Sequence, residues 1–154
     1  MRVLLTGMSG TGKSTVVHEL RRRDFAAYDA DDDGFTEPAG DGTWRWRTSA
    51  VTALLDRHDA GLVFFAGCSD EQAQFAWDRQ VLLTVPEVVL LERLKSRTSN
   101  DFGKSKSDRE RVLLDLREVE PLLRRVADRV VSTDRPLADV VDEVLAAALG
   151  KRRA

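Results

Sequence analysis

Gly7-Met8-Ser9-Gly10-Thr11-Gly12-Lys13-Ser14 fits the pattern G-x-x-x-x-G-K-[ST] at every fixed position. The apolar segment Val3-Leu4-Leu5-Thr6 precedes it and predicts a buried parallel strand, and residues 14–23 predict a helix directly after it. Glycines let the chain turn several backbone N–H groups toward an anion, and the positive end of the following helix adds to the attraction. The stretch therefore predicts a phosphate loop (P-loop) that binds a polyphosphate.

Each residue of this loop has an expected role. Lys13 is expected to reach the outer phosphates, and the Ser14 hydroxyl to ligate Mg²⁺, with Thr15 as a second candidate. The residues predicted to bind the nucleotide through the loop are Gly7, Met8, Ser9, Gly10, Thr11, Gly12, Lys13, Ser14 and Thr15.

Length and composition predict one globular domain over residues 1–154. The 154 residues are 42% hydrophobic and 32% charged, and no apolar run approaches the length that spans a bilayer. The first five residues are too short for the apolar region of a signal peptide. The single cysteine, Cys68, excludes an internal disulfide and fits a reducing cytosol, so we expect a cytoplasmic protein without membrane contact. The formal net charge of −2 disfavours a nucleic-acid partner.

Acidic residues crowd the end of the second predicted strand. Phe25-Ala26-Ala27-Tyr28 is that strand, and Asp29-Ala30-Asp31-Asp32-Asp33-Gly34 follows it. Ligands of open α/β sheets bind beyond the carboxyl ends of the strands, where the P-loop also lies. We therefore expect one of these aspartates to meet the Mg²⁺ shell or an acceptor hydroxyl, and Asp32 and Asp33 to form a solvated turn without a role.

Two tryptophans alternate with two arginines after a predicted loop at residues 36–43. Trp44-Arg45-Trp46-Arg47 can clamp and stack on an anionic or planar substrate. The same residues can equally form a hydrophobic lid over the core with outward-pointing arginines. The sequence leaves these two interpretations open, and it predicts a helix over residues 47–58.

The third strand, residues 61–66, is continuously apolar and is predicted to be central. It ends in Gly67-Cys68-Ser69 and lacks the acidic pair that a nucleoside-triphosphatase motor would carry there, so the sequence argues against a motor. Cys68 is expected to be a small buried residue and not a nucleophile.

The second half of the chain is predicted to hold two more strands, three helices and a lid. The strands are residues 79–85 and 129–132, and the helices are residues 86–96, 108–127 and 136–149, with Pro121 kinking or restarting the second of them. The polar, glycine-containing segment at about 97–107 is predicted to close over bound phosphates, using Arg97, Lys104 and Lys106, or else to be a solvated linker.

The order of these features resembles the small P-loop kinases of the nucleoside-monophosphate kinase group, shikimate kinase and gluconate kinase in particular. Proteins of this kind are often labelled AAA-family ATPases. The resemblance spans nearly the whole chain, and its most specific element is the P-loop. It implies a three-layer α/β/α domain with five parallel strands in the order 2-3-1-4-5, and Mg²⁺ and ATP as cofactors.

The resemblance also implies roles for individual residues. Asp29 would lie near Mg²⁺ together with Ser14, and Asp31 would bind the acceptor hydroxyl and take its proton. Arg97 would be the catalytic lid arginine beside Lys13, and Arg93 a second arginine on the nucleotide. Thr133-Asp134-Arg135-Pro136 falls where the family packs against adenine, which makes Thr133 and Pro136 nucleotide-binding candidates.

The acceptor side departs from the two named kinases. Gly67-Cys68-Ser69 stands where shikimate kinase has three glycines, and Asp101 stands where gluconate kinase has its lid histidine. Arg45 or Arg47 would replace the arginine that holds the carboxylate of shikimate. The predicted acceptor-binding residues are thus Asp29, Asp31, Arg45, Arg47 and Gly67.

We therefore predict an enzyme, a monomer or homodimer, that transfers the γ-phosphoryl group of ATP to a hydroxyl of a small metabolite. One alternative is a nucleoside or nucleotide kinase in which Trp44 or Trp46 stacks on a base. Another, of a different class, is a nucleotide-binding regulatory ATPase that acts on a protein partner.

Overall fold

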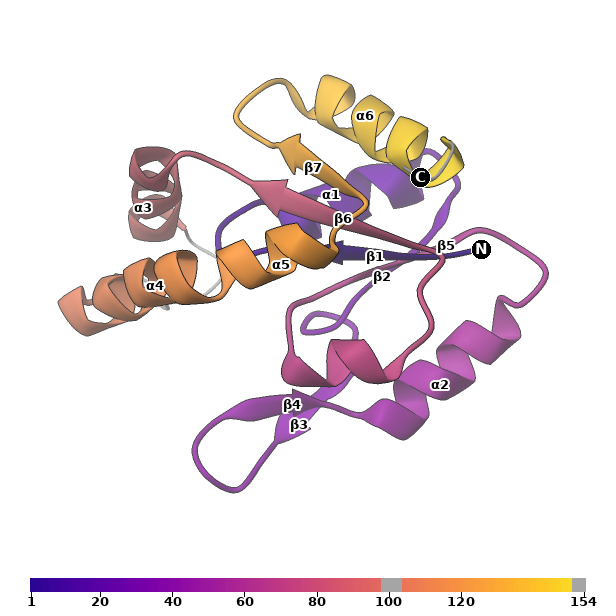
Figure 1. The fold of residues 1–154 in the computed structure, drawn as a ribbon, viewed down its shortest axis with the longest axis horizontal. Coiled ribbons are helices and arrows are strands. Elements are labelled where there is room, and N and C mark those ends of the chain that lie inside the picture. Colours follow the sequence, from indigo (N-terminus) through magenta and orange to yellow (C-terminus); the bar gives the residue numbers. More distant parts are fainter. Residues whose placement is uncertain (98–103, 151–154) are drawn as a thin grey trace.

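The computed structural model describes residues 1–97 and 104–150 and contains a five-stranded parallel sheet (Figure 1). The strands lie in the order β2-β5-β1-β6-β7, and every neighbouring pair is parallel. Their bounds are β1 (Arg2–Thr6), β2 (Ala26–Asp29), β5 (Val63–Ala66), β6 (Arg79–Thr84) and β7 (Arg129–Ser132). The α/β class is confirmed. The labels differ from the expected 2-3-1-4-5 because the hairpin strands β3 and β4 come between β2 and β5 in the chain.

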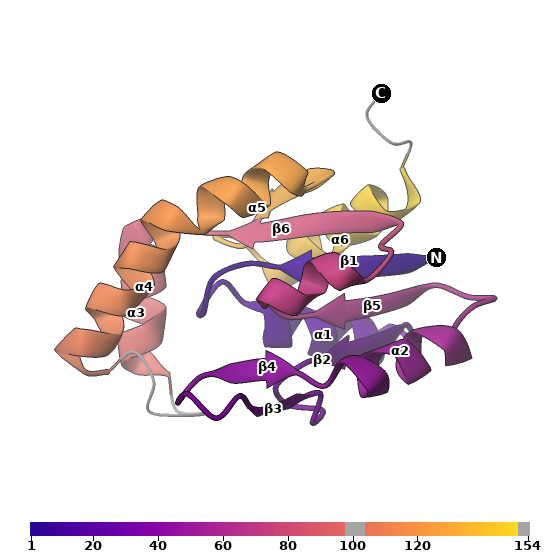
Figure 2. The ribbon, with the colours of Figure 1, turned by 60° about the horizontal axis from the view of Figure 1, so that its bottom comes forward.

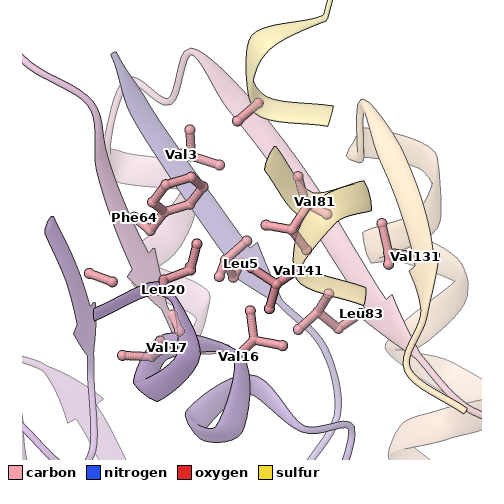
Figure 3. Packing of buried hydrophobic residues seen from close by; sticks show 14 of the residues in the cluster. Val3, Leu5, Val16, Val17, Leu20, Phe64, Val81, Leu83, Val131 and Val141 are labelled. Atoms are coloured by element: carbon pink, nitrogen blue, oxygen red, sulfur yellow. The ribbon is translucent and has the colours of Figure 1, made fainter. Parts of the chain in front are cut away.

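Helices cover both faces of this sheet, because its strands carry apolar side chains on both sides. Val3 and Leu5 of β1 pack against α1 (Lys13–Arg22) and α6 (Leu137–Leu149) on one face (Figure 3). Leu4 points to the opposite face, where α2 (Thr48–Arg57) packs. On that same face α5 (Glu120–Val126) packs its Leu123 against Leu82 of β6. Figure 2 shows the sheet between these two layers.

A short antiparallel hairpin replaces the loop that the sequence predicts at residues 36–43. Strand β3 (Thr36–Pro38) pairs with β4 (Trp44–Trp46). Gly40 and Gly42 in the connection both have positive φ angles, 87° and 86°, which glycine adopts without steric cost. Trp44 and Trp46 share one face of β4, but only Trp46 reaches the core: it is 3% exposed, whereas Trp44 is 66% exposed. The Trp46 ring packs on Phe65 with ring centroids 5.0 Å apart, so Trp46 covers the core and offers no free face to a base.

The helix expected over residues 108–127 is two helices. α4 (Lys106–Glu118) ends before Val119, and α5 restarts with Pro121 in its first turn, where a missing N–H costs nothing. α3 (Glu87–Ser96) precedes the segment at about 97–107. Residues 98–103, and with them Asp101 and most of the predicted lid, lie outside the described residues.

Cys68 is exposed and is not the buried residue that the sequence predicts. It lies in the connection between β5 and the 3₁₀ helix η1 (Asp70–Gln74), just beyond the carboxyl end of the sheet. Within residues 1–97 and 104–150, no helix combines the length and the apolar character needed to cross a membrane.

Candidate active site

The P-loop connects β1 to α1 at the centre of the sheet. Gly7 has a φ of 153°, and a Cβ there would lie 2.4 Å from the Leu83 carbonyl oxygen of the neighbouring strand β6. Gly12, with a φ of 96°, precedes the first residue of α1. Both positions need glycine because an L-residue with a side chain rarely adopts these angles. The loop thus wraps around the amino-terminal end of α1, as anion binding requires.

We expect Gly7→Ala to weaken Mg²⁺-ATP binding at least tenfold and to lower the free energy of unfolding by roughly 1–3 kcal/mol, because the new methyl group collides with backbone. Calorimetric titration and urea unfolding measure the two effects. Gly34→Ala is the matched control, since Gly34 also has a positive φ, 77°, but has nothing within 4 Å of a built Cβ. Equal effects of the two variants on ATP binding would contradict the close approach as the cause.

Lys13 folds back across the loop. Its Nζ donates to the carbonyl oxygens of Gly7 at 2.7 Å and Met8 at 3.0 Å. Burial lowers the pKa of the Lys13 ammonium, whereas Cys68, Asp29 and Asp31 act in the opposite direction. A polyphosphate entering the loop would supply the negative charge that this buried cation needs.

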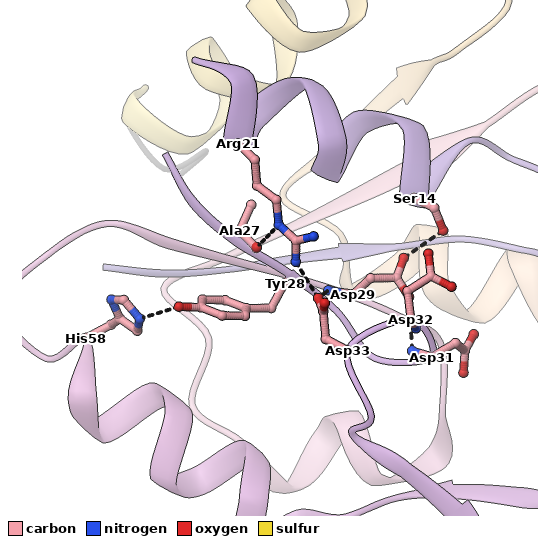
Figure 4. A network of polar contacts seen from close by, with 9 residues as sticks. All are labelled: Ser14, Arg21, Ala27, Tyr28, Asp29, Asp31, Asp32, Asp33 and His58. Carbon is pink, nitrogen blue, oxygen red and sulfur yellow. Dashed lines mark hydrogen bonds and ion pairs between the residues drawn. The ribbon is translucent and has the colours of Figure 1, made fainter. Parts of the chain in front are cut away.

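Asp29 joins the acidic turn to the P-loop (Figure 4). Its Oδ2 accepts a hydrogen bond from the Ser14 hydroxyl at 2.7 Å. Its Oδ1 accepts from the backbone N–H groups of Asp31 at 2.9 Å and Asp32 at 3.1 Å. Only 4% of Asp29 is exposed. The structure therefore brings together the two residues expected to hold Mg²⁺.

The other three aspartates of the turn have different surroundings. Asp33 forms an ion pair with Arg21 and accepts from the backbone N–H of Asp29. The Asp32 carboxylate lies beside that of Asp29 on the side of Ser14, whereas Asp31 lies farther from Ser14, and both line the cleft (Figure 4). Partial desolvation raises the pKa of the Asp31 carboxyl, and the neighbouring charge of Asp29 adds to the shift. Asp31 therefore accepts a proton more readily than a fully solvated aspartate does.

Helix α3 and the turn after β7 form the opposite wall. Arg93 donates to the hydroxyl of Thr133 at 2.9 Å and to its carbonyl oxygen at 2.8 Å. The Thr133 hydroxyl donates in turn to the Thr11 carbonyl oxygen of the P-loop at 2.6 Å. Arg97 donates to the Ser9 hydroxyl at 3.1 Å. Arg93 lies in α3 and Arg97 directly follows it, and both contact residues predicted to bind the nucleotide.

We expect Thr133→Val to lower the free energy of unfolding by about 1–3 kcal/mol, because the isosteric valine leaves the Thr11 carbonyl and one Arg93 N–H without this partner in a buried site. Urea unfolding measures the change. Ser132→Ala is the control, since Ser132 is exposed and its hydroxyl accepts only a long 3.4 Å hydrogen bond from the Asp134 N–H. Similar losses in both variants would show that the buried bridge between the two walls contributes nothing.

These groups line one cleft of about 870 Å³. Twelve of the predicted site residues line it: Ser9, Gly10, Gly12, Lys13, Ser14, Thr15, Asp29, Asp31, Gly67, Arg93, Arg97 and Thr133. Gly7, Met8, Thr11 and Pro136 do not line it. Met8 and Thr11 are buried, and Pro136 lies just before α6, whereas its neighbours Arg135 and Leu137 line the cleft.

Arg45 and Arg47 are not brought into the cleft. Arg45 pairs with Glu37 across the exposed hairpin at 3.0 Å, and Arg47 donates to the Gly34 carbonyl oxygen at 3.1 Å. The register of the hairpin points Arg45 to solvent and Trp46 to the core, and the predicted acceptor role of Arg45 and Arg47 stays a prediction. Gly67, also a predicted acceptor residue, does line the cleft, and a Cβ there would lie 2.8 Å from Trp46.

Further cleft residues were missed by sequence reasoning. His18 and Arg22 line the cleft together with Ser14, and the spacing of four residues places all three on one face of α1. That spacing is the sequence feature from which His18 and Arg22 could have been predicted to lie near Ser14. Asp32 also lines the cleft, although the sequence assigned it no role.

A loop whose geometry suits an anion and an acidic turn held against it by the Ser14–Asp29 hydrogen bond line the same cleft, and the arrangement defines the class as a small P-loop kinase. A family model described as AAA domain matches residues 3–114. Shikimate kinase of Aromatoleum aromaticum is 32% identical over 152 residues, covering 88% of this chain and 86% of that protein. The chain therefore belongs to the AAA-domain family, among the P-loop kinases of the nucleoside-monophosphate kinase group.

Solved structures agree on the fold. Shikimate kinase from Acinetobacter baumannii in complex with shikimate superposes with a TM-score of 0.68 at 20% identity, covering 94% of this chain and 90% of that one. A gluconokinase from Sinorhizobium meliloti 1021 gives 0.60 at 22% identity, covering 96% and 90%. The protein is an ATP-dependent small-molecule phosphotransferase.

Proposed function

We propose that Lys13, Asp31 and Arg97 carry the transfer of the ATP γ-phosphoryl group to a hydroxyl of a small metabolite. The observation that supports this best is the Ser14–Asp29 hydrogen bond of 2.7 Å, because it holds the acidic turn against the P-loop. Asp31 is thereby fixed two residues along, in the same cleft as Lys13. Phosphoryl transfer depends mainly on such positioning and on neutralising charge.

The nucleotide would lie along the P-loop wall. Backbone N–H groups of the loop would surround the phosphates, and Lys13 would turn from the carbonyl groups of Gly7 and Met8 to the phosphate oxygens. Arg97, next to Ser9, would approach the same charge from the lid side. Arg93 and Thr133 would border the base.

The residues present fit a magnesium ion. Ser14 and Asp29 offer two oxygen atoms at the edge of the P-loop, and Mg²⁺ typically takes one or two protein oxygens and completes its shell with phosphates and water. When bound, the ion neutralises charge on the transferring phosphoryl group. The Asp31 carboxylate would orient the acceptor hydroxyl and accept its proton.

The acceptor hydroxyl would enter from the side of Gly67, opposite the arginines of α3. The named relatives act on shikimate and gluconate, and both of these compounds carry hydroxyl groups on a small carbon skeleton. We further propose that the protein works in the cytoplasm, since its single cysteine, Cys68, is exposed and fits a reducing compartment.

The test is ADP release measured with ATP and a panel of sugars, amino sugars, hydroxy acids and nucleosides, with ³¹P NMR to identify the phosphorylated product. We expect at least one hydroxylated compound to raise turnover well above the basal rate. If none does and a partner protein does, the chain is a regulatory ATPase and the proposal is wrong. If only nucleosides do, the acceptor is a base-bearing compound.

A further inference from the structure

Two carboxylates of the acidic turn, Asp31 and Asp32, have no hydrogen-bond or ion-pair partner in the part of the chain that the structure describes. Asp29 is occupied by Ser14 and two backbone N–H groups, and Asp33 by Arg21. Within residues 1–97 and 104–150, the side chains of Asp31 and Asp32 form neither a hydrogen bond nor an ion pair, yet both line the cleft. One carboxylate suffices to orient an acceptor hydroxyl, so the second is available for another group of the acceptor.

The positively charged side chains that line the cleft contact other groups of the protein. Lys13 is held at the P-loop, Arg97 contacts Ser9, and Arg93 contacts Thr133, so all three face the phosphates. The remaining arginines of the cleft, Arg22 and Arg135, are paired with glutamates. Once a nucleoside triphosphate is bound, its negative charge neutralises the positive charges of Lys13, Arg93 and Arg97.

The hairpin beside the acceptor side adds no positive charge to the cleft. Arg45 is paired with Glu37, and Arg47 donates to Gly34 outside the cleft. Asp70 and Glu71 begin η1 just after the Gly67-Cys68-Ser69 connection, but neither lines the cleft, and Glu71 accepts from the Ser69 hydroxyl and the Trp46 N–H. An acceptor resting on Gly67 therefore meets the carboxylates of Asp31 and Asp32, whereas each arginine or lysine among the described residues that lines the cleft already contacts another protein group.

We propose that the acceptor is a positively charged hydroxylated compound, an amino sugar or amino alcohol, whose ammonium group pairs with Asp32 while its hydroxyl is held by Asp31. The inference rests on the proposed kinase function and names the acceptor class for the same site. It departs from shikimate and gluconate, which are both carboxylates and would be repelled by Asp31 and Asp32.

The first experiment compares acceptors of similar size that carry different charges: glucosamine, glucose and gluconate in one trio, and ethanolamine, ethylene glycol and glycolate in another. In each trio we expect the amine to have the highest kcat/KM and the acid the lowest. Asp32→Asn should lower the amine-to-neutral ratio of kcat/KM roughly tenfold, the usual scale for a hydrogen bond to a charged group. Asp59→Asn, an equal charge change at a side chain 86% exposed and outside the cleft, should leave the ratio unchanged.

The second experiment needs no turnover. Hydroxylated fragments, divided equally among amines, neutral compounds and acids, are screened for binding by saturation-transfer NMR in the presence of Mg²⁺-ADP. We expect amines to outnumber acids several-fold among the hits, and Asp32→Asn to remove the excess. No excess of amines, or no hits at all, overturns the inference.

The two experiments separate this inference from the proposed function. If a hydroxy acid is the best substrate, or if Asp32→Asn leaves the ratio unchanged, the kinase function stands and the charge inference is wrong. If amines bind preferentially but no compound raises ADP release, the charge inference stands and the kinase proposal is wrong.

Discussion

Lys13→Ala should lower kcat by about 10²- to 10³-fold, the loss typical of removing one donor that stabilises transition-state charge. Lys13 is the P-loop cation, and its Nζ lies within 3.0 Å of two carbonyl oxygens at the centre of the loop. No other lysine among the described residues lines the cleft, so no neighbour can replace it. ADP release with the identified acceptor measures the effect.

The same substitution should leave the fold intact, with a change in the free energy of unfolding below about 2 kcal/mol. Burial lowers the pKa of the Lys13 ammonium, so the folded protein pays a desolvation cost for this charge that partly offsets its two hydrogen bonds. Lys95→Ala, on the exposed side of α3, is the control and should retain full activity. Lys13→Ala with more than a tenth of the original kcat would remove Lys13 from the mechanism.

Asp31→Asn should lower kcat by about 10²- to 10⁴-fold while ATP affinity changes less than threefold. Asparagine keeps the size of the side chain and can still contact a hydroxyl, but it cannot accept the proton. Desolvation and the charge of Asp29 raise the pKa of the Asp31 carboxyl, which makes it a better proton acceptor than a solvated aspartate. Steady-state kinetics and calorimetric titration with Mg²⁺-ATP separate the two effects.

Asp59→Asn serves again as the matched control and should change neither quantity. An Asp31→Asn enzyme that keeps its kcat but needs more acceptor would show that Asp31 binds the hydroxyl without taking its proton. A parallel loss of ATP affinity would instead indicate that the turn from Asp29 to Asp33 had moved away from Ser14. Such coupling is expected because Asp29 accepts hydrogen bonds from both the Ser14 hydroxyl and the Asp31 N–H.

Much of the fold follows from local pattern. The strands at residues 3–6 and 61–66 are continuous apolar runs, which only a sheet covered on both faces can bury, and the structure places them side by side at its centre. Their carboxyl ends carry the P-loop and Gly67, and parallel strands bring those ends to one edge. The position of the P-loop site, and an aspartate of the acidic turn beside it, could therefore be predicted from residue types and spacing, whereas the choice of Asp29 came from the family resemblance.

The hairpin could not be predicted in the same way. Three-residue strands carry too little periodicity to distinguish them from a loop, and Trp44 and Trp46 are identical in type. Trp46 is buried because it contacts Phe65 of β5 and lies close to Gly67 just after that strand, both distant in sequence, whereas Trp44 is exposed to solvent. The same register carries Arg45 away from the cleft.

The sequence by itself determined the P-loop, the α/β class and the chemical identity of the groups around a phosphate, because these depend on glycine conformations, strand hydrophobicity and neighbours along the chain. Only the tertiary structure decided which aspartates have hydrogen-bond or ion-pair partners, where Arg45 and Arg47 point and which side chain packs against Gly67 in the cleft. Those properties depend on contacts such as Asp33 with Arg21 and Trp46 with Gly67, which join residues that no local pattern relates.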